Sequence, residues 1–295
     1  MSAPLKKSGF VALVGRSNVG KSTLLNALIG SKVAIVSPKP QTTRLPVRGI
    51  LTDEKRGQVV FVDTPGVFLQ KPDALSQRLN ELVKEQLEGI EAVLYVIDPA
   101  RAPGPEEAHL QSLLARVAIP KIVLINKCDL PEHNRPFMQE ARAIDVGQEA
   151  TYEISALKHH ELNRVVDHVF TLLPEGEWFY PPMQLTDLSH REWLEEIVRE
   201  KTFLRLRKEL PYTVKVEVTD ISAPREDLER VEATVWTTDD RYKKMLIGAG
   251  GSMIKLIGSD ARKEIELSMG KRVHLELRVQ VDPQWMKRFL YAHSA

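Results

Sequence analysis

The stretch G-R-S-N-V-G-K-S-T, Gly15–Thr23, decides the fold of this 295-residue chain. It follows the apolar run Phe10–Val14 and precedes an amphipathic segment. Strand, glycine-rich loop and helix in this order predict a phosphate-binding loop, because the glycines let backbone N–H groups face phosphate oxygens and the helix dipole adds attraction. We expect Lys21 to meet the β- and γ-phosphates and Ser22 to bind Mg²⁺. The expected loop residues are Gly15, Asn18, Val19, Gly20, Lys21, Ser22 and Thr23.

The composition bounds the class of protein. The length predicts two domains, and a hydrophobic content of 43% suffices for two cores. The net charge of +1 argues neither for nor against nucleic-acid binding. A single cysteine rules out an intrachain disulfide framework and fits a reducing compartment. The polar start, Met1–Ser8, is too short for a signal peptide, and no apolar run approaches the roughly 18 residues that span a bilayer. We therefore expect any membrane association to be peripheral.

Residues 1–173 alternate between short apolar runs and longer amphipathic segments. This order predicts an α/β domain with a mostly parallel sheet and helices on both faces, whose ligands bind at the carboxyl ends of the strands. The expected strands are Phe10–Val14, Val59–Asp63, Ala92–Asp98, Lys121–Asn126 and Tyr152–Ser155. The expected helices are Lys21–Ile29, Ala74–Glu88, Pro105–Ala115 and Leu162–Leu172.

The sequence N-K-C-D, Asn126–Asp129, points to guanine. An aspartate at position 129 can accept hydrogen bonds from the N1–H and the exocyclic amine of guanine, whereas adenine has neither donor in that arrangement and would leave a buried carboxylate unpaired. Asn126 can tie this loop to the phosphate loop, and the stem of Lys127 can lie along the base. We interpret Cys128 as a small filler and not as a nucleophile. The nucleotide expected here is GTP or GDP.

Two further motifs follow predicted strands. In D-T-P-G, Asp63–Gly66, Asp63 can hold Mg²⁺ through a water, and the N–H of Gly66 can meet the γ-phosphate because no side chain blocks its approach. In S-A-L, residues Ser155, Ala156 and Leu157, we expect the N–H of Ala156 to donate to guanine O6. This tripeptide is not specific by itself and supports a guanine site only together with the other motifs.

The loop S-P-K-P-Q-T-T-R, residues 37–44, has no hydrophobic periodicity. A threonine there can reach Mg²⁺ and the γ-phosphate; we favour Thr43, with Thr42 as the rival, and the alternative is that both are ordinary loop residues. Val67 follows Gly66, and an aliphatic side chain cannot polarise a water. The attacking water must then be positioned by backbone groups, an ion or a partner, which predicts slow intrinsic turnover.

Three prolines and a glycine predict a linker at residues 174–182, and residues 183–295 form a second domain. Its expected elements are a helix Ser189–Arg207 capped by Ser189 and Glu192, strands Tyr212–Thr219 and Leu228–Thr237, helices Tyr242–Ile247 and Ser252–Met269, a strand Val273–Val279 and a short helical tail in Pro283–Ala292.

The sequence G-A-G-G, Gly248–Gly251, separates two predicted helices, so backbone and helix N-terminal amides can approach a nucleic acid backbone. Residues 241–288 carry eleven Lys or Arg and five acidic residues, a local charge of +6, as phosphate contact requires. Ile247, Ile254 and Ile257 could support bases or belong to the core. The expected RNA contacts are Lys243, Lys244, Ile247, Gly248, Ala249, Gly250, Gly251, Lys255 and Arg262.

The nucleotide motifs resemble those of the translation-factor-related class of GTPases, and the second domain resembles a type II KH domain. One domain of each kind, together with Q-T-T-R at 41–44, resembles the Era family over nearly the whole chain; Ser17 departs from that family's usual proline. The resemblance implies GTP hydrolysis with Mg²⁺ held by Ser22, Thr43 and Asp63, and catalytic roles for Lys21, Thr43, Gly66 and Asn18. It also suggests that Asn18 binds K⁺; the alternative is that Asn18 only stabilises the loop.

The resemblance further implies binding of the 3′ end of small-subunit (16S) rRNA and a role in assembling the small ribosomal subunit, in the cytoplasm and with a possible visit to the inner membrane surface. One alternative is a nucleotide-dependent RNA-binding module whose turnover is incidental. Another is a ribosome-handling GTPase of a different family with a KH-like tail, which the single GTPase domain disfavours.

Overall fold

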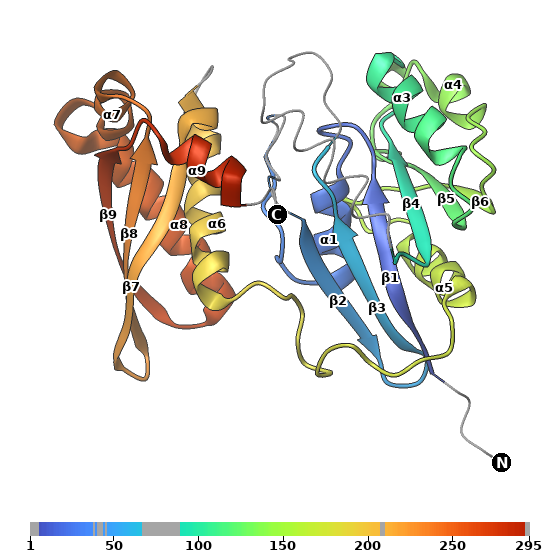
Figure 1. Ribbon diagram of the computed structural model, residues 1–295, viewed down its shortest axis with the longest axis horizontal. Coiled ribbons are helices and arrows are strands. Elements are labelled where there is room, and N and C mark those ends of the chain that lie inside the picture. Colours follow the sequence, from blue (N-terminus) through green and yellow to red (C-terminus); the bar gives the residue numbers. More distant parts are fainter. Residues whose placement is uncertain are drawn as a thin grey trace. The chain divides into compact units, whose positions relative to one another are not determined.

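A computed structural model of the protein describes residues 6–37, 39, 44, 46–66, 89–206 and 210–292 (Figure 1). The chain divides into two compact units: residues 1–36 with 43–187, and residues 188–295 with 37–42. The expected helix Ala74–Glu88 lies outside the described residues, as do Thr42, Thr43 and Val67.

A six-stranded sheet in the order β2-β3-β1-β4-β5-β6 forms the centre of the first unit. The strands β1, β3, β4, β5 and β6 run parallel, and β2 pairs antiparallel with β3. The prediction of a mostly parallel sheet is confirmed, although β2 was not predicted and β6 begins two residues before the expected strand. The bounds are β1 Lys7–Val14, β2 Val47–Asp53, β3 Gly57–Asp63, β4 Ala92–Ile97, β5 Lys121–Ile125 and β6 Ala150–Glu153.

The described helices of this unit are α1 Lys21–Ile29, α3 Pro105–Leu114, α4 Met138–Arg142 and α5 Leu162–Leu172. Leu110 of α3 and Ala141 of α4 pack with Val14 and Tyr95 of the sheet in one buried cluster. On the opposite face, Gly49 of β2 leaves room for α1, because an added Cβ would lie 2.5 Å from Leu25. Helices therefore cover both faces, as predicted.

Residues 174–182, the expected linker, lie along the first unit. Glu175 forms an antiparallel bridge with Lys7, and the N–H groups of Phe179 and Tyr180 both donate to Oε1 of Gln58 at 2.9 Å. The rings of Phe179 and Phe10 are 4.7 Å apart. The first unit thus extends to residue 187.

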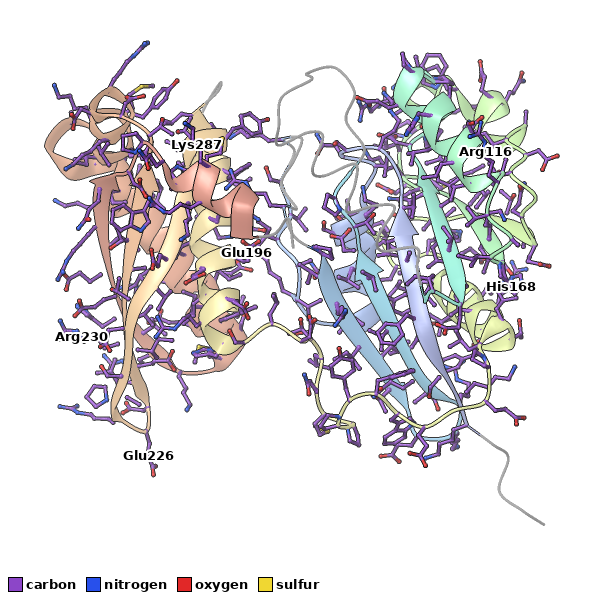
Figure 2. All side chains as sticks on the ribbon, viewed as in Figure 1. Arg116, His168, Glu196, Glu226, Arg230 and Lys287 are labelled. Carbon is purple, nitrogen blue, oxygen red and sulfur yellow. The ribbon has the colours of Figure 1, made fainter. Side chains whose placement is uncertain are left out.

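The second unit places helices against a three-stranded sheet, β7-β8-β9, in which β7 and β8 are antiparallel and β8 and β9 are parallel. Glu226 marks the turn between β7 and β8 (Figure 2). The predicted capping box of α6 is confirmed. The bounds are α6 His190–Arg205, a 3₁₀ turn Leu210–Thr213, β7 Lys215–Arg225, β8 Leu228–Thr237, α7 Asp240–Ile247, a 3₁₀ turn Ala249–Gly251, α8 Ser252–Met269, β9 Arg272–Val281 and α9 Trp285–Ala292.

The core of this unit joins α6 and α8 to the sheet. Val198, Val216, Val235 and Ala261 are all buried in the same cluster. The expected strand at Tyr212–Thr219 begins later than predicted because its first residues belong to the 3₁₀ turn, where Pro211 lacks a backbone N–H for a sheet ladder.

Candidate functional site

The phosphate loop connects β1 to α1, which is the order of elements that its sequence predicts. Asn18 and Gly20 adopt φ angles of +65° and +102°. Nζ of Lys21 donates to the carbonyl oxygens of Gly15 at 2.9 Å and Arg16 at 3.0 Å. Burial lowers the pKa of Lys21 to about 8, while the Asp63 carboxylate opposes that change. The loop therefore holds a buried amine that an added anion would keep protonated.

Two positions of the loop accept only glycine, because a Cβ would collide with fixed groups. At Gly15 it would lie 2.4 Å from the carbonyl oxygen of Val96, and at Gly20 it would lie 2.4 Å from Nδ2 of Asn126. These glycines let the loop pack directly against β4 and the loop after β5.

Ser22, at the start of α1, and Asp63, at the end of β3, meet beside the phosphate loop. Oγ of Ser22 donates to Oδ2 of Asp63 at 2.5 Å. A hydroxyl and a carboxylate are the hard oxygen ligands that Mg²⁺ takes together with phosphate oxygens, so this pair fits that ion. The structure brings these two predicted ligands together; Thr43, the third, is outside the described residues.

The D-T-P-G motif lies against the phosphate loop. Thr64 Oγ1 donates to the carbonyl oxygen of Leu13 at 2.7 Å. A Cβ on Gly66 would lie 2.6 Å from Cα of Ser17. The close approach of Gly66 to Ser17 therefore depends on the missing side chain, and its predicted contact with the γ-phosphate stays a prediction.

Asn126 joins the motifs at the ends of three strands. Its Nδ2 donates to the carbonyl oxygen of Val19 at 2.9 Å, and its Oδ1 accepts from the N–H of Ala156 at 3.0 Å. Oγ of Ser155 donates to Oδ1 of Asp129 at 2.5 Å. The predicted tie to the phosphate loop is thus confirmed, and the three loops form one connected site.

Two details differ from the sequence predictions. The N–H of Ala156, expected to face guanine, donates to Asn126 in this structure because the amide oxygen of Asn126 lies within reach. Asp129, expected as a buried carboxylate, is exposed, and so is Leu157.

Asp98 holds Lys127 in place. Nζ of Lys127 lies 2.6 Å from Oδ2 of Asp98 and 3.2 Å from the carbonyl oxygen of Asn18. The sequence predicts Asp98 only as the last residue of a strand. Its position at a carboxyl end of the parallel sheet was the available signal.

A buried cluster behind the phosphate loop was also missed. Nε of Arg16 lies 3.1 Å from Oε2 of Glu106, and Nη1 of Arg16 lies 3.8 Å from Oε2 of Glu107. Tyr95 donates its hydroxyl to Glu107, and burial raises the pKa of that carboxyl. The signal was an arginine inside a phosphate loop together with two acids at the start of a predicted helix.

The glycine turn of the second unit has the backbone that its composition predicts. Gly248, Gly250 and Gly251 adopt φ angles of +72°, +58° and +80°. A Cβ on Gly248 would lie 2.9 Å from the backbone nitrogen of Met253. Glycine is therefore required where the chain turns from α7 into α8.

A groove of about 390 Å³ runs between α8 and β9. Lys255 and Arg262 supply its positive charge, and both are exposed. The lining residues are Ile254, Lys255, Gly258, Ser259 and Arg262 from α8, and His274, Leu275, Glu276 and Leu277 from β9. The groove combines cations with an apolar wall, which suits a phosphate backbone with attached bases.

The predicted RNA-contacting residues differ in their exposure and in their position relative to the groove. Ile257 is fully buried in the core, so it offers no surface for a base, whereas Ile254 lines the groove and Ile247 is half-buried. Lys243 and Lys244 lie on α7, which leads into the glycine turn. His274 and Ser259 were not predicted, because their place follows from the pairing of a helix with a strand.

Every helix among the described residues is too short or too polar to span a lipid bilayer. The same residues hold no cluster of three or more His, Cys, Asp or Glu side chains arranged for a metal.

Comparison with known proteins covers both units. Residues 10–127 match the family described as 50S ribosome-binding GTPase, and residues 209–286 match the KH domain family. The GTPase Era of Carboxydothermus hydrogenoformans is 41% identical over 300 residues, covering 98% of this chain and 97% of that protein. The corresponding protein of Heliobacterium modesticaldum is 37% identical, covering 96% and 94%.

Two solved structures resemble the chain along its length. Each has a TM-score of 0.88 at 36% identity and covers 97% of both chains. One is Era in complex with MgGDPNP and nucleotides 1506–1542 of 16S ribosomal RNA. The other is a variant of Aquifex aeolicus Era bound to GDP·AlF4⁻.

Proposed function

Because this chain belongs to the Era family of GTPases and hydrolyses GTP, we propose that the phosphate loop and the loops after β3, β5 and β6 form its guanine-nucleotide site. The observation that supports this most strongly is Asn126, whose side chain bonds both Val19 in the phosphate loop and Ala156 in the loop after β6. The loops proposed to contact the base and the phosphates are therefore joined to each other by the hydrogen bonds of Asn126.

Each part of the site has a proposed role. Lys21 contacts the β- and γ-phosphates, and the N–H of Gly66 meets the γ-phosphate. Asp129 selects guanine, and Lys127 flanks the base. The remaining proposed contacts are Gly15, Asn18, Val19, Gly20, Ser22, Thr23, Ser155, Ala156 and Leu157.

Ser22 and Asp63 hold Mg²⁺ in this proposal, with Thr43 as a third ligand and Thr42 as its rival. When bound, the ion neutralises charge that develops on the phosphate oxygens. The two described side chains orient each other through their 2.5 Å hydrogen bond.

The groove between α8 and β9 is the proposed RNA site. Its ligand is the 3′ end of small-subunit rRNA, which is supported by the related Era crystallised with nucleotides 1506–1542 of 16S rRNA. Lys255 and Arg262 neutralise phosphates at the groove, and backbone amides at the glycine turn add contacts. Through this binding the protein assists assembly of the small ribosomal subunit.

Nucleotide state controls RNA binding in this proposal. The sequence S-P-K-P-Q-T-T-R, residues 37–44, lies in the chain between α1 and β2. A segment that the γ-phosphate orders and that hydrolysis releases would make RNA binding depend on the bound nucleotide.

Fluorescence anisotropy with a labelled single-stranded 16S 3′-end fragment tests the RNA site on the full chain. Arg262→Ala removes a cation from the groove, so we expect the affinity for the RNA fragment to fall about fivefold to tenfold. The slope of the logarithm of the binding constant against the logarithm of the salt concentration should become shallower by about 1. Arg225→Ala is the matched control, because Arg225 is an exposed arginine at the end of β7 and does not line the groove. Equal losses in the two variants would reject the groove as the site.

Hydrolysis of GTP with and without the same fragment tests the coupling. Stimulation by RNA supports a GTPase whose cycle is coupled to RNA. RNA affinity that is equal in the GTP-analogue and GDP states, with no stimulation of hydrolysis by RNA, contradicts this coupling and leaves an RNA-binding module with incidental turnover.

The binding of K⁺ by Asn18 stays a prediction. A comparison of GTP hydrolysis rates in KCl and in NaCl tests it, and equal rates would reject it. The cytoplasmic and inner-membrane locations also stay predictions.

A further inference from the structure

The hydroxyl of Ser17 is buried inside the phosphate loop. Ser17 is 7% exposed, and its Oγ has no hydrogen-bond partner among the residues that the structure describes. A buried hydroxyl without a partner is unfavourable, because it loses its bonds to water and gains none. Such a group in a binding loop calls for a partner that arrives with the ligand.

The hydroxyl lies on the side of the loop that faces the D-T-P-G motif. A Cβ added to Gly66 would lie 2.8 Å from Oγ of Ser17 and 2.6 Å from its Cα. Asp63, three residues before Gly66, receives the Ser22 hydroxyl. Ser17 Oγ therefore lies at the end of the loop where the terminal phosphate is expected, away from the base-binding residues around Asp129.

Neighbouring contacts hold the Ser17 backbone in place. Its carbonyl oxygen accepts from Nη1 of Arg101 at 2.7 Å. The preceding residue, Arg16, donates to Glu106 at 3.1 Å and to the carbonyl oxygen of Ala102 at 2.9 Å. With the backbone anchored, rotation of the hydroxyl is the freedom that remains for reaching a ligand.

We propose that Ser17 donates its hydroxyl hydrogen to an oxygen of the γ-phosphate, and so makes the site prefer a nucleoside triphosphate over a diphosphate. This inference rests on the proposed nucleotide site. A terminal phosphate offers charged acceptor oxygens, and a hydrogen bond to a charged group is stronger than one between neutral groups. GDP lacks those oxygens and gains nothing from Ser17.

Isothermal titration calorimetry of the full chain with Mg²⁺ tests the preference, using GMPPNP and GDP as ligands. Ser17→Ala should weaken GMPPNP binding about tenfold and change GDP binding less than twofold. Ser31→Ala is the control, because Ser31 is exposed just after α1; both of its affinities should match the unaltered protein. An unchanged GMPPNP affinity in Ser17→Ala, or equal losses for both nucleotides, overturns the inference.

Urea unfolding without nucleotide separates a binding role from a structural one. Ser17→Ala should be at least as stable as the unaltered protein, because the removed hydroxyl has no partner to lose. A clear loss of stability would show that the hydroxyl supports the fold and would overturn the inference. If the unaltered protein binds neither nucleotide, the proposed nucleotide site itself fails.

Discussion

The buried amine of Lys21 makes nucleotide binding depend on pH. Burial lowers its pKa from 10.5 to about 8. Phosphate oxygens favour the charged amine, so binding near pH 8 must take up a proton. The half-protonated amine predicts an uptake of about half a proton per nucleotide at pH 8, against about a tenth at pH 7.

The same pKa predicts how stability varies with pH. The unfolded chain keeps the Lys21 proton up to about pH 10.5, whereas the folded chain loses it near pH 8. Between these values the unfolded state binds more protons, so this group makes stability rise with pH. The full difference between the two pKa values is worth about 3 kcal/mol.

Calorimetric titration of GDP in two buffers with different ionisation enthalpies measures the proton uptake at pH 7 and pH 8. Urea unfolding without nucleotide at pH 7.5 and 9.5 measures the stability change, and Lys21→Met should abolish the part that Lys21 contributes. Uptake near zero at pH 8, or a stability slope that survives in Lys21→Met, would refute the reasoning.

Three other substitutions test separate contacts, each by urea unfolding. Gly66→Ala places a Cβ 2.6 Å from the Ser17 backbone and should lower stability by about 1–3 kcal/mol, while the control Gly176→Ala, whose added Cβ has no neighbour closer than 3.9 Å, should change it little. Arg16→Met removes the guanidinium that lies 3.1 Å from the buried carboxylate of Glu106 and should cost about 3–5 kcal/mol at pH 8; a loss below 1 kcal/mol would contradict this. Ser189→Ala removes the capping box of α6 and should cost about 1 kcal/mol; an unchanged midpoint would show that the cap contributes nothing.

The sequence allowed accurate prediction where the cause is local. The bounds of α1 follow from the glycine at each end, and both residues adopt positive φ. The capping box of α6 depends on Ser189 and Glu192, three residues apart. The nucleotide motifs could be placed together because the carboxyl ends of parallel strands share one edge of the sheet.

Pairings between distant residues could not be predicted. Strand β2 was missed because only its pairing with β3 shows it as a strand, and its last residues are polar and partly exposed. Arg16 and Glu106 are 90 residues apart, and no spacing rule joins them. His274 lines the groove only because β9 lies beside α8. The extent of the first unit to residue 187 likewise depends on contacts with β1 and β2.

Because β9 is the last strand of the chain and pairs with β8, the groove should be completed after the nucleotide site during synthesis of the chain. Every described loop of the nucleotide site lies before residue 158, whereas one wall of the groove is β9, Arg272–Val281. A growing polypeptide that has passed α5 but not β9 already has the described loops of the proposed nucleotide site and still lacks that wall. Nascent chains should therefore acquire nucleotide affinity first and affinity for single-stranded RNA only when β9 has joined the sheet.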